Sequence, residues 1–125
     1  MLMDAVENKK LATSPPNGSK LFDKADMLSR MDGDHDFVGM ILEESSEELQ
    51  KLLEVLIDLC RGDDAKAIRI HAHTMKGMAA NISAAPLRDV AARIESAAMR
   101  DDLVTVWELL PELERTVVLT VEAIR

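Results

Sequence analysis

Residues 64–82 read DAKAIRIHAHTMKGMAANI, and their apolar side chains recur with the period of an α-helix. On a helical wheel of about 100° per residue, one stripe about 80° wide collects five of them. These are Ile68, Ala72, Met75, Ala79 and Ile82. The stripe predicts an amphipathic helix that buries this face, with the aspartate pair Asp63-Asp64 as its N-terminal cap.

Four more helices are predicted around this one. A short amphipathic segment carries Phe22, Ala25, Leu28 and Met31 and ends at Asp32-Gly33. A long helix follows over about residues 37–60, capped by Asp34 or Asp36. The last two begin at Pro86 and at Asp101-Asp102, and Pro111 is expected to kink the final helix.

Short connections between these helices favour antiparallel neighbours. We therefore predict an all-α fold, an antiparallel up-down four-helix bundle with a short additional N-terminal helix. Residues 21–125 form this bundle, and residues 1–20 are predicted to be a flexible lead-in because they contain the breaker run TSPPNGS. Trp107 is expected in the core.

Composition supports one helical domain and excludes several functions. The 125 residues are 47% hydrophobic, yet they include only two phenylalanines, one tryptophan and no tyrosine, which disfavours a β-sandwich. The net charge of −8 argues against binding of nucleic acid or anionic membranes. The lone Cys60 and the lack of a signal peptide or spanning segment predict a cytoplasmic protein.

The exposed face of the 64–82 helix carries an unusual group of residues. His73 lies about 140° from Ile68, with Arg69 one turn before it and Lys76 and Gly77 one turn after it. A glycine inside a helix costs about 1 kcal/mol relative to alanine, but Gly77 clears space beside the imidazole.

This arrangement suggests reversible phosphorylation of His73. Unprotonated imidazole is a nucleophile near neutral pH, and Lys76 and Arg69 are placed to offset the charge of a phosphoryl group. A histidine that is merely solvated is the simpler alternative from spacing alone. A metal site at His71 and His73 is disfavoured, because residues two apart on a helix point about 200° apart.

The segment His73-Thr74-Met75-Lys76-Gly77 resembles the H-x-x-K-G signature of histidine-containing phosphotransfer (HPt) domains. The resemblance covers about residues 21–125. It includes five further segments: residues 21–23, residues 31–34, Arg61-Gly62-Asp63-Asp64, Pro86-Leu87 and Ile94-Glu95. One departure is Ile82-Ser83, where the family commonly has a Leu-Gly pair.

The resemblance implies a four-helix bundle that accepts a phosphoryl group from the aspartate of one receiver domain and passes it to another. His73 matches the acceptor, Lys76 the lysine that offsets phosphate charge, and Gly77 the small residue that leaves the ring accessible. Arg69 is a further candidate for stabilising the phosphoryl charge, and it is suggested by helix geometry alone. The implied partners are receiver domains of response regulators or of a hybrid sensor histidine kinase.

The chain is predicted to be a phosphocarrier and not an enzyme with its own ATP site. The sequence has no glycine-rich phosphate loop and no clustered carboxylates for magnesium, so no cofactor of its own is expected and the receiver would supply Mg²⁺. A monomer is the expected state. Two alternatives remain: a receiver-docking scaffold that is not phosphorylated, and a domain of a larger hybrid or chemotaxis-type histidine kinase.

Overall fold

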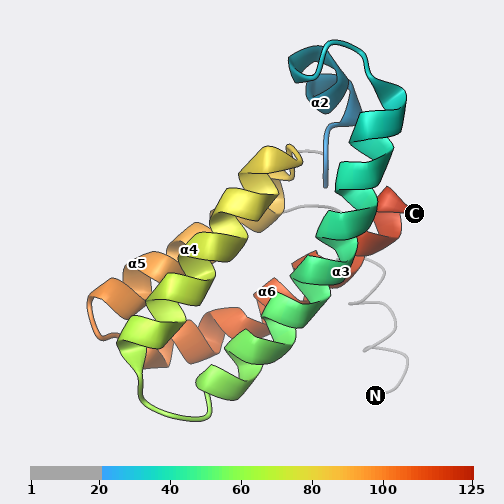
Figure 1. Ribbon diagram of the computed structural model, residues 1–125. Helices are drawn as coiled ribbons and strands as arrows, with labels where there is room; N and C mark the ends of the chain where they lie inside the picture. Colours follow the sequence, from blue (N-terminus) through green and yellow to red (C-terminus); the bar gives the residue numbers. More distant parts are fainter. Residues whose placement is uncertain (1–20) are drawn as a thin grey trace, which may run out of the picture.

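Helices make up the regular structure of the described chain. The computed structural model describes residues 21–125, so the predicted flexible lead-in, residues 1–20, lies outside the described residues. The helices are α2 (Lys24–Arg30), α3 (His35–Leu59), α4 (Ala65–Asn81), α5 (Ala85–Met99) and α6 (Leu103–Ile124). The predicted all-α fold with a short N-terminal helix is confirmed (Figure 1).

Each of the four long helices packs against two of the others. Helix α3 packs against α4, α4 against α5, α5 against α6, and α6 returns to α3. Figure 1 shows the chain reversing direction at each connection, with α2 packed near the N-terminal end of α3, beyond the ends of α4 and α5. The antiparallel up-down order predicted from short connections is therefore present.

The core forms where the apolar stripes of the four helices meet. All five residues of the predicted α4 stripe have no exposed surface. Their neighbours in the core come from each of the other long helices and include Leu49, Leu56, Leu87, Ile94 and Leu113. Burial of one such side chain is worth about 1.5–3 kcal/mol, so the stripe fixes which face of α4 remains outside.

Aspartates cap three of the long helices. Asp34 and not Asp36 caps α3, because its side chain accepts the backbone N–H of Phe37 at 3.0 Å. Asp64 caps α4 through the N–H of Ala67, and Asp102 caps α6 through the N–H of Thr105. Each cap satisfies a backbone donor that has no partner within the helix.

Two expectations about individual side chains are wrong. Trp107 is 49% exposed, because the preceding Val106 is fully buried and the helix turns by about 100° per residue. The indole N–H still has a partner, since it donates to the carbonyl of Cys60 at 2.9 Å. In α2, Ala25 is exposed and Met27 is the buried side chain. Helix α6 continues through Pro111, and the kink there stays a prediction.

Ser83, the departure from the family pattern, ends α4 in a left-handed conformation. Its φ is +57°, a region that glycine adopts more easily. The N–H of Ser83 donates to the carbonyl of Ala80 at 3.1 Å, and that of Ala84 to the carbonyl of Ala79 at 2.8 Å. These paired bonds form the Schellman motif that commonly closes a helix.

The Ser83 side chain also ties α2 to this turn. Its hydroxyl donates to Asp26 Oδ2 at 2.5 Å and accepts from Arg30 Nη2 at 2.6 Å. The same guanidinium nitrogen donates to the carbonyl of Asn81 at 3.0 Å. The Ser83 hydroxyl, and next Arg30, holds the pKa of Asp26 below its ordinary value. A serine therefore gains side-chain bonds that offset its backbone strain.

We predict that Ser83→Ala is less stable than the wild type by about 1 kcal/mol, because it keeps the strained φ and loses both hydroxyl bonds. Ser83→Gly relieves the strain and is expected to be more stable than Ser83→Ala by about 1 kcal/mol. Urea denaturation measures both variants, with the exposed Ser29→Ala on α2 as control. Equal stability of the alanine variant and the wild type would contradict this account.

Candidate functional site

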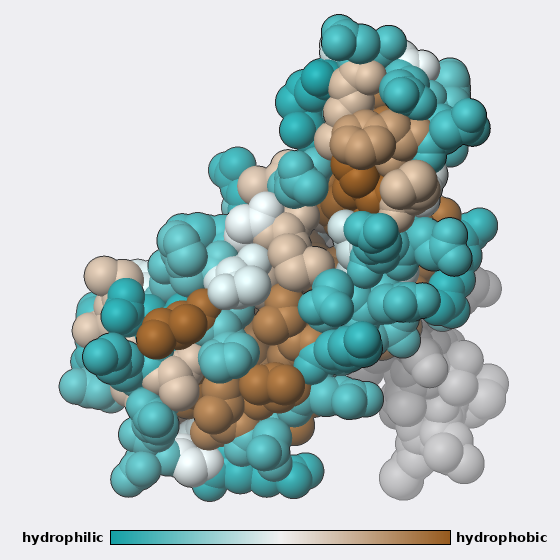
Figure 2. Space-filling model, viewed as in Figure 1, coloured by the Kyte–Doolittle hydropathy of each residue, from teal (hydrophilic) through white to brown (hydrophobic). Residues whose placement is uncertain are grey.

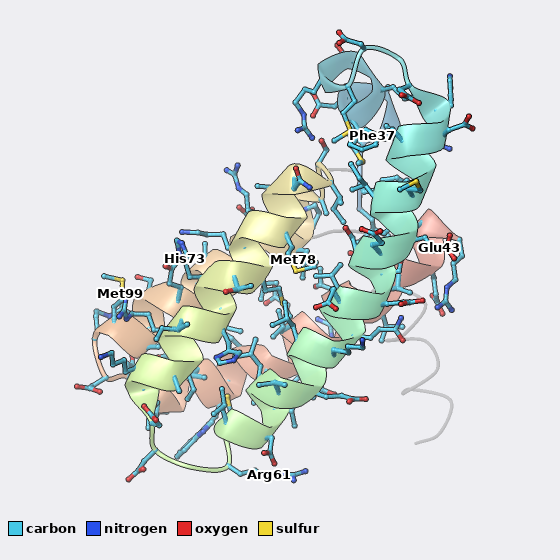
Figure 3. All side chains as sticks on the ribbon, viewed as in Figure 1. Phe37, Glu43, Arg61, His73, Met78 and Met99 are labelled. Atoms are coloured by element: carbon cyan, nitrogen blue, oxygen red, sulfur yellow. The ribbon has the colours of Figure 1, made fainter. Side chains whose placement is uncertain are left out.

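His73 lies on the outer face of α4, as the wheel predicts. Its side chain is 66% exposed, and its Nδ1 lies 2.7 Å from Oε2 of Glu95 on the neighbouring helix α5. In Figure 3 the His73 side chain points away from the bundle on the side of α4 toward α5. The ring is thus open to a partner and held at one edge.

Glu95 joins the two residues that the sequence singled out. Its second oxygen, Oε1, lies 2.6 Å from Nζ of Lys76, which is one turn beyond His73 on α4. The Glu95 side chain is only 13% exposed, and that of Lys76 is 32% exposed. A single carboxylate therefore binds the imidazole with one oxygen and the ammonium with the other.

The electrostatics of Glu95 follow from these contacts. The hydrogen bond from Lys76, opposed by partial burial and aided by His73, holds the pKa of Glu95 below its ordinary value. Glu95 is thus a carboxylate at neutral pH. An ionised carboxylate only accepts hydrogen bonds, so the Nδ1 of His73 is the protonated nitrogen in neutral imidazole.

This assignment leaves Nε2 as the nitrogen with a free lone pair. The two ring nitrogens are distinct, and the partner of one decides the protonation of the other. Since Nδ1 faces Glu95 and the side chain is mostly exposed, Nε2 is the atom available to a reagent from outside. The arrangement is that of an oriented nucleophile supported by a neighbouring base.

Sequence reasoning missed the role of Glu95. Its position, 22 residues after His73, gives no local spacing signal. The available signal is its register on α5, where Glu95 follows the buried Ile94 and lies four residues after the buried Ala91. A carboxylate at the margin of an apolar stripe needs a partner, and α4 provides two.

Gly77 lies one turn beyond His73 and has open space beside it. A Cβ built on Gly77 meets no heavy atom within 4 Å outside its own turn. Nothing inside the domain therefore requires a glycine here, although glycine lowers helix stability by about 1 kcal/mol. This open space lies one helical turn beyond His73 on α4.

The other candidate residues are placed differently. Arg69 lies half-buried one turn before His73, and within residues 21–125 it forms no hydrogen bond or ion pair. His71 is half-buried, and its Nδ1 lies 2.9 Å from the carbonyl oxygen of Ala67. The structure thus gives His71 and His73 separate partners on different faces of α4.

Exposed apolar side chains border the site. Ile70, three residues before His73, is 46% exposed, and Met99, four residues after Glu95, is 66% exposed. Figure 3 shows Met99 on the same side of the molecule as His73, and Figure 2 shows hydrophobic surface among hydrophilic side chains along this face. The imidazole is therefore bordered by a partly apolar surface of the kind that a partner protein can cover.

A family model described as the Hpt domain matches residues 36–124, more than two thirds of the chain. The chain belongs to the Hpt domain family. The matched range contains His73, Lys76, Gly77 and Glu95, and an Hpt domain is a phosphotransfer domain of phosphorelay signalling.

The fold of this Hpt domain is similar to that of a solved structure, histidine-containing phosphotransfer protein B (HptB) from Pseudomonas aeruginosa PAO1. The TM-score is 0.78 at 23% sequence identity, covering 85% of this chain and 92% of that chain. A search of curated proteins found no match. Among the helices described, none combines the length and apolar character needed to cross a membrane.

We predict that Glu95→Gln destabilises the domain in a pH-dependent way. Because folding lowers the pKa of Glu95, its contribution is complete above the ordinary value of 4.5 and is lost as the pH falls through the folded pKa. The free energy of unfolding should therefore differ by about 1–2 kcal/mol at pH 7 and converge in acid. Denaturation between pH 7 and pH 3 measures this difference.

The same variant tests how His73 is oriented. With a neutral amide in place of the carboxylate, the ¹⁵N shifts of His73 should show less of the Nδ1-protonated form. Glu112→Gln is the matched control, because it removes another interhelical ion pair, that with Arg93. Unchanged ¹⁵N shifts in Glu95→Gln would mean that the carboxylate does not set the tautomer.

Proposed function

We propose that this Hpt domain accepts a phosphoryl group on Nε2 of His73 from the phosphorylated aspartate of one receiver domain and passes it to another. The observation that carries the proposal is the geometry of His73. Its side chain is 66% exposed, and its Nδ1 is bound to Glu95, which directs the Nε2 lone pair outward.

The transfer step balances without another reactant. The Nε2 lone pair attacks phosphorus in line with the acyl phosphate, the N–P bond forms, and the P–O bond to the receiver aspartate breaks. The aspartate leaves as a carboxylate. Positive charge that develops on the ring lies next to the Glu95 carboxylate, which stabilises it.

Lys76 is the cation proposed to offset the phosphoryl charge. In the unphosphorylated domain its ammonium is bound to Glu95, and three rotatable bonds beyond its Cβ allow it to swing toward a phosphoryl group on the adjacent ring. Arg69, one turn on the other side and without an ion pair among the described residues, is a second candidate. Gly77 leaves space for the receiver to approach.

We propose a phosphocarrier and not a kinase. The domain provides a nucleophile on a rigid helix, and the receiver supplies the aspartate and its Mg²⁺. The partners proposed are receiver domains of response regulators or of a hybrid sensor kinase. The domain is proposed to act as a monomer with no cofactor of its own.

The direct test is to locate the phosphoryl group. The protein is incubated with a receiver domain that has been phosphorylated by a small acyl phosphate, and the product is examined by ³¹P and ¹⁵N NMR. We expect one phosphoramidate coupled to Nε2 of His73. Coupling to Nδ1 would contradict the assigned role of Glu95, and a protein that binds receivers without being labelled would be a docking scaffold.

Charge is distributed unevenly over the bundle, and this predicts salt-dependent association. Helix α4 carries Lys66, Arg69 and Lys76 with no acidic residue, whereas α3 carries seven acidic residues and one lysine. An acidic receiver surface would therefore be steered toward α4 and away from α3.

We predict that the association rate with a receiver falls about tenfold between 20 mM and 500 mM salt. Stopped-flow measurements on the wild type and on Lys66→Gln test this expectation. The variant should associate more slowly at low salt and match the wild type at high salt. A rate independent of salt would show that steering by α4 does not contribute.

A further inference from the structure

The outer face of α6 carries an apolar stripe that the described part of the domain leaves uncovered. Four residues form the stripe: Val104, Trp107, Pro111 and Val118. On a wheel of about 100° per residue they fall within about 60° of one another. Val104 is 61% exposed, Trp107 49% and Val118 50%, and Pro111 is exposed as well. The two valines lie about 21 Å apart along the axis, so the stripe runs along most of the helix.

The core does not use this stripe, because α6 buries a different face. The apolar residues that α6 buries are Val106, Leu113, Val117 and Val121. The helix packs against α3 and α5, and Figure 1 shows it behind α3 and α4. Its outer face is therefore turned away from α4 and His73, and the stripe belongs to a different surface from the phosphotransfer site.

The indole of Trp107 can be covered without the loss of a hydrogen bond. Its N–H already donates to the carbonyl of Cys60 at 2.9 Å, so a partner that covers the exposed part of the ring leaves no donor unpaired. Tryptophan is also enriched at the centres of protein interfaces. An exposed apolar row with an aromatic residue in it is typical of a surface that binds another protein.

Two exposed charged residues beside the stripe, Glu108 and Arg115, indicate which partner fits it. Within residues 21–125 neither side chain forms an ion pair or a hydrogen bond. They lie on the same margin of the stripe, about 20° apart on the wheel, with Pro111 midway between them along the helix. If a second copy of α6 packs antiparallel about a two-fold axis at Pro111, Glu108 of each copy lies next to Arg115 of the other. The same axis brings Val104 of each copy next to Val118 of the other. The surface is therefore complementary to itself in charge and in apolar character.

The same two charges disfavour a parallel arrangement. Two copies of α6 packed in parallel would place Glu108 beside Glu108 and Arg115 beside Arg115, and like charges at a contact repel each other. The antiparallel pair instead has two equivalent ion pairs, one on each side of Pro111. The charges thus select both the partner and its orientation.

We propose that the apolar stripe of α6, together with Glu108 and Arg115, binds the same surface of a second copy in a two-fold antiparallel pair. This inference goes beyond the proposed phosphotransfer and does not depend on it. Each copy keeps a complete site on α4, so the single domain remains the unit that transfers the phosphoryl group. A contact along one helix is at the small end of protein interfaces, so we expect a dissociation constant on the order of 100 μM and monomers at lower concentrations.

Sedimentation equilibrium of the full chain tests the proposal. The range is about 10 μM to 1 mM protein, in about 150 mM salt to screen the net charge of −8. We expect the average mass to rise from 13.8 kDa toward twice that value. The emission of Trp107, the only tryptophan, should shift to the blue over the same range, because the pair covers its ring. A mass that stays at 13.8 kDa at 1 mM would overturn the proposal.

A charge exchange tests the predicted ion pairs. Arg115→Glu should weaken association at least tenfold, because it places two carboxylates next to each other at both ends of the contact. Combining it with Glu108→Arg restores opposite charges and should return the dissociation constant to within about threefold of the wild type. Arg88→Glu on α5 changes the net charge equally and is the matched control. Association that Arg115→Glu leaves unchanged, or that the double variant does not restore, would overturn the proposal in favour of another surface.

A second pair of variants tests the apolar stripe. Val118→Lys should abolish association at 1 mM, whereas Val55→Lys, at a valine of α3 that is 41% exposed, should leave it unchanged. Circular dichroism verifies that both variants are folded. Equal association of the two variants would overturn the proposal. A monomer whose Trp107 emission is already blue-shifted at 10 μM, and moves to the red in Val118→Lys, would overturn it in favour of coverage by residues 1–20.

Discussion

His73→Gln is expected to abolish phosphoryl acceptance, lowering the rate by at least about a thousandfold to background. Glutamine keeps a polar side chain at an exposed helix position, so the fold is unaffected. Its amide has no basic lone pair on nitrogen and forms no phosphoramidate. Radiolabel transferred from a phosphorylated receiver, followed through acid and base treatment, measures the loss.

The matched control for this variant is His71→Gln. His71 lies on the same helix, is half-buried, and its Nδ1 lies within hydrogen-bond distance of a backbone carbonyl of its own helix, so the variant should be labelled like the wild type. Acid-labile, base-stable label on wild type and His71→Gln, but not on His73→Gln, is the expected pattern. Label on all three proteins would show that another residue is the acceptor.

Much of the fold could be predicted because each helix carries its own signals. The apolar stripe of α4 predicted which face is buried. The opposite face, which carries His73, was therefore predicted to be exposed. Asp64 and Asp102 capped the helices they precede, because a short acidic side chain reaches the free N–H three residues later. These signals are local in the sequence, so a single sequence is enough to recognise them.

What could not be predicted depends on contacts between helices. The pairing of Glu95 with His73 and Lys76 requires the rotation of α5 against α4, which no local spacing encodes. Trp107 was expected in the core with the other apolar residues of the last helix, yet a bond from its indole N–H to the end of α3 allows it to stay half-exposed. At Ser83 the family pattern suggested glycine, and the bonds that compensate come from α2, more than fifty residues earlier.

Gly77→Leu is expected to separate stability from function. Leucine has a much higher helix propensity than glycine, and a Cβ at this position meets no atom of the domain within 4 Å outside its own turn. The free energy of unfolding should therefore rise by about 0.5–1 kcal/mol. The same side chain occupies the space beside the His73 ring, so the receiver aspartate stays too far from Nε2 for in-line attack.

The expected loss in transfer rate is at least about a hundredfold, because a displacement of about 1 Å from the reactive geometry is enough for that. Gly77→Ala should show the same gain in stability with a smaller loss of transfer, and Glu114→Leu, an exposed site on α6, serves as the control for added apolar surface. A more stable variant that transfers poorly can be explained only by the requirements of a partner. A Gly77→Leu variant that transfers normally would show that the receiver approaches His73 from another side, over Ile70 and Arg69.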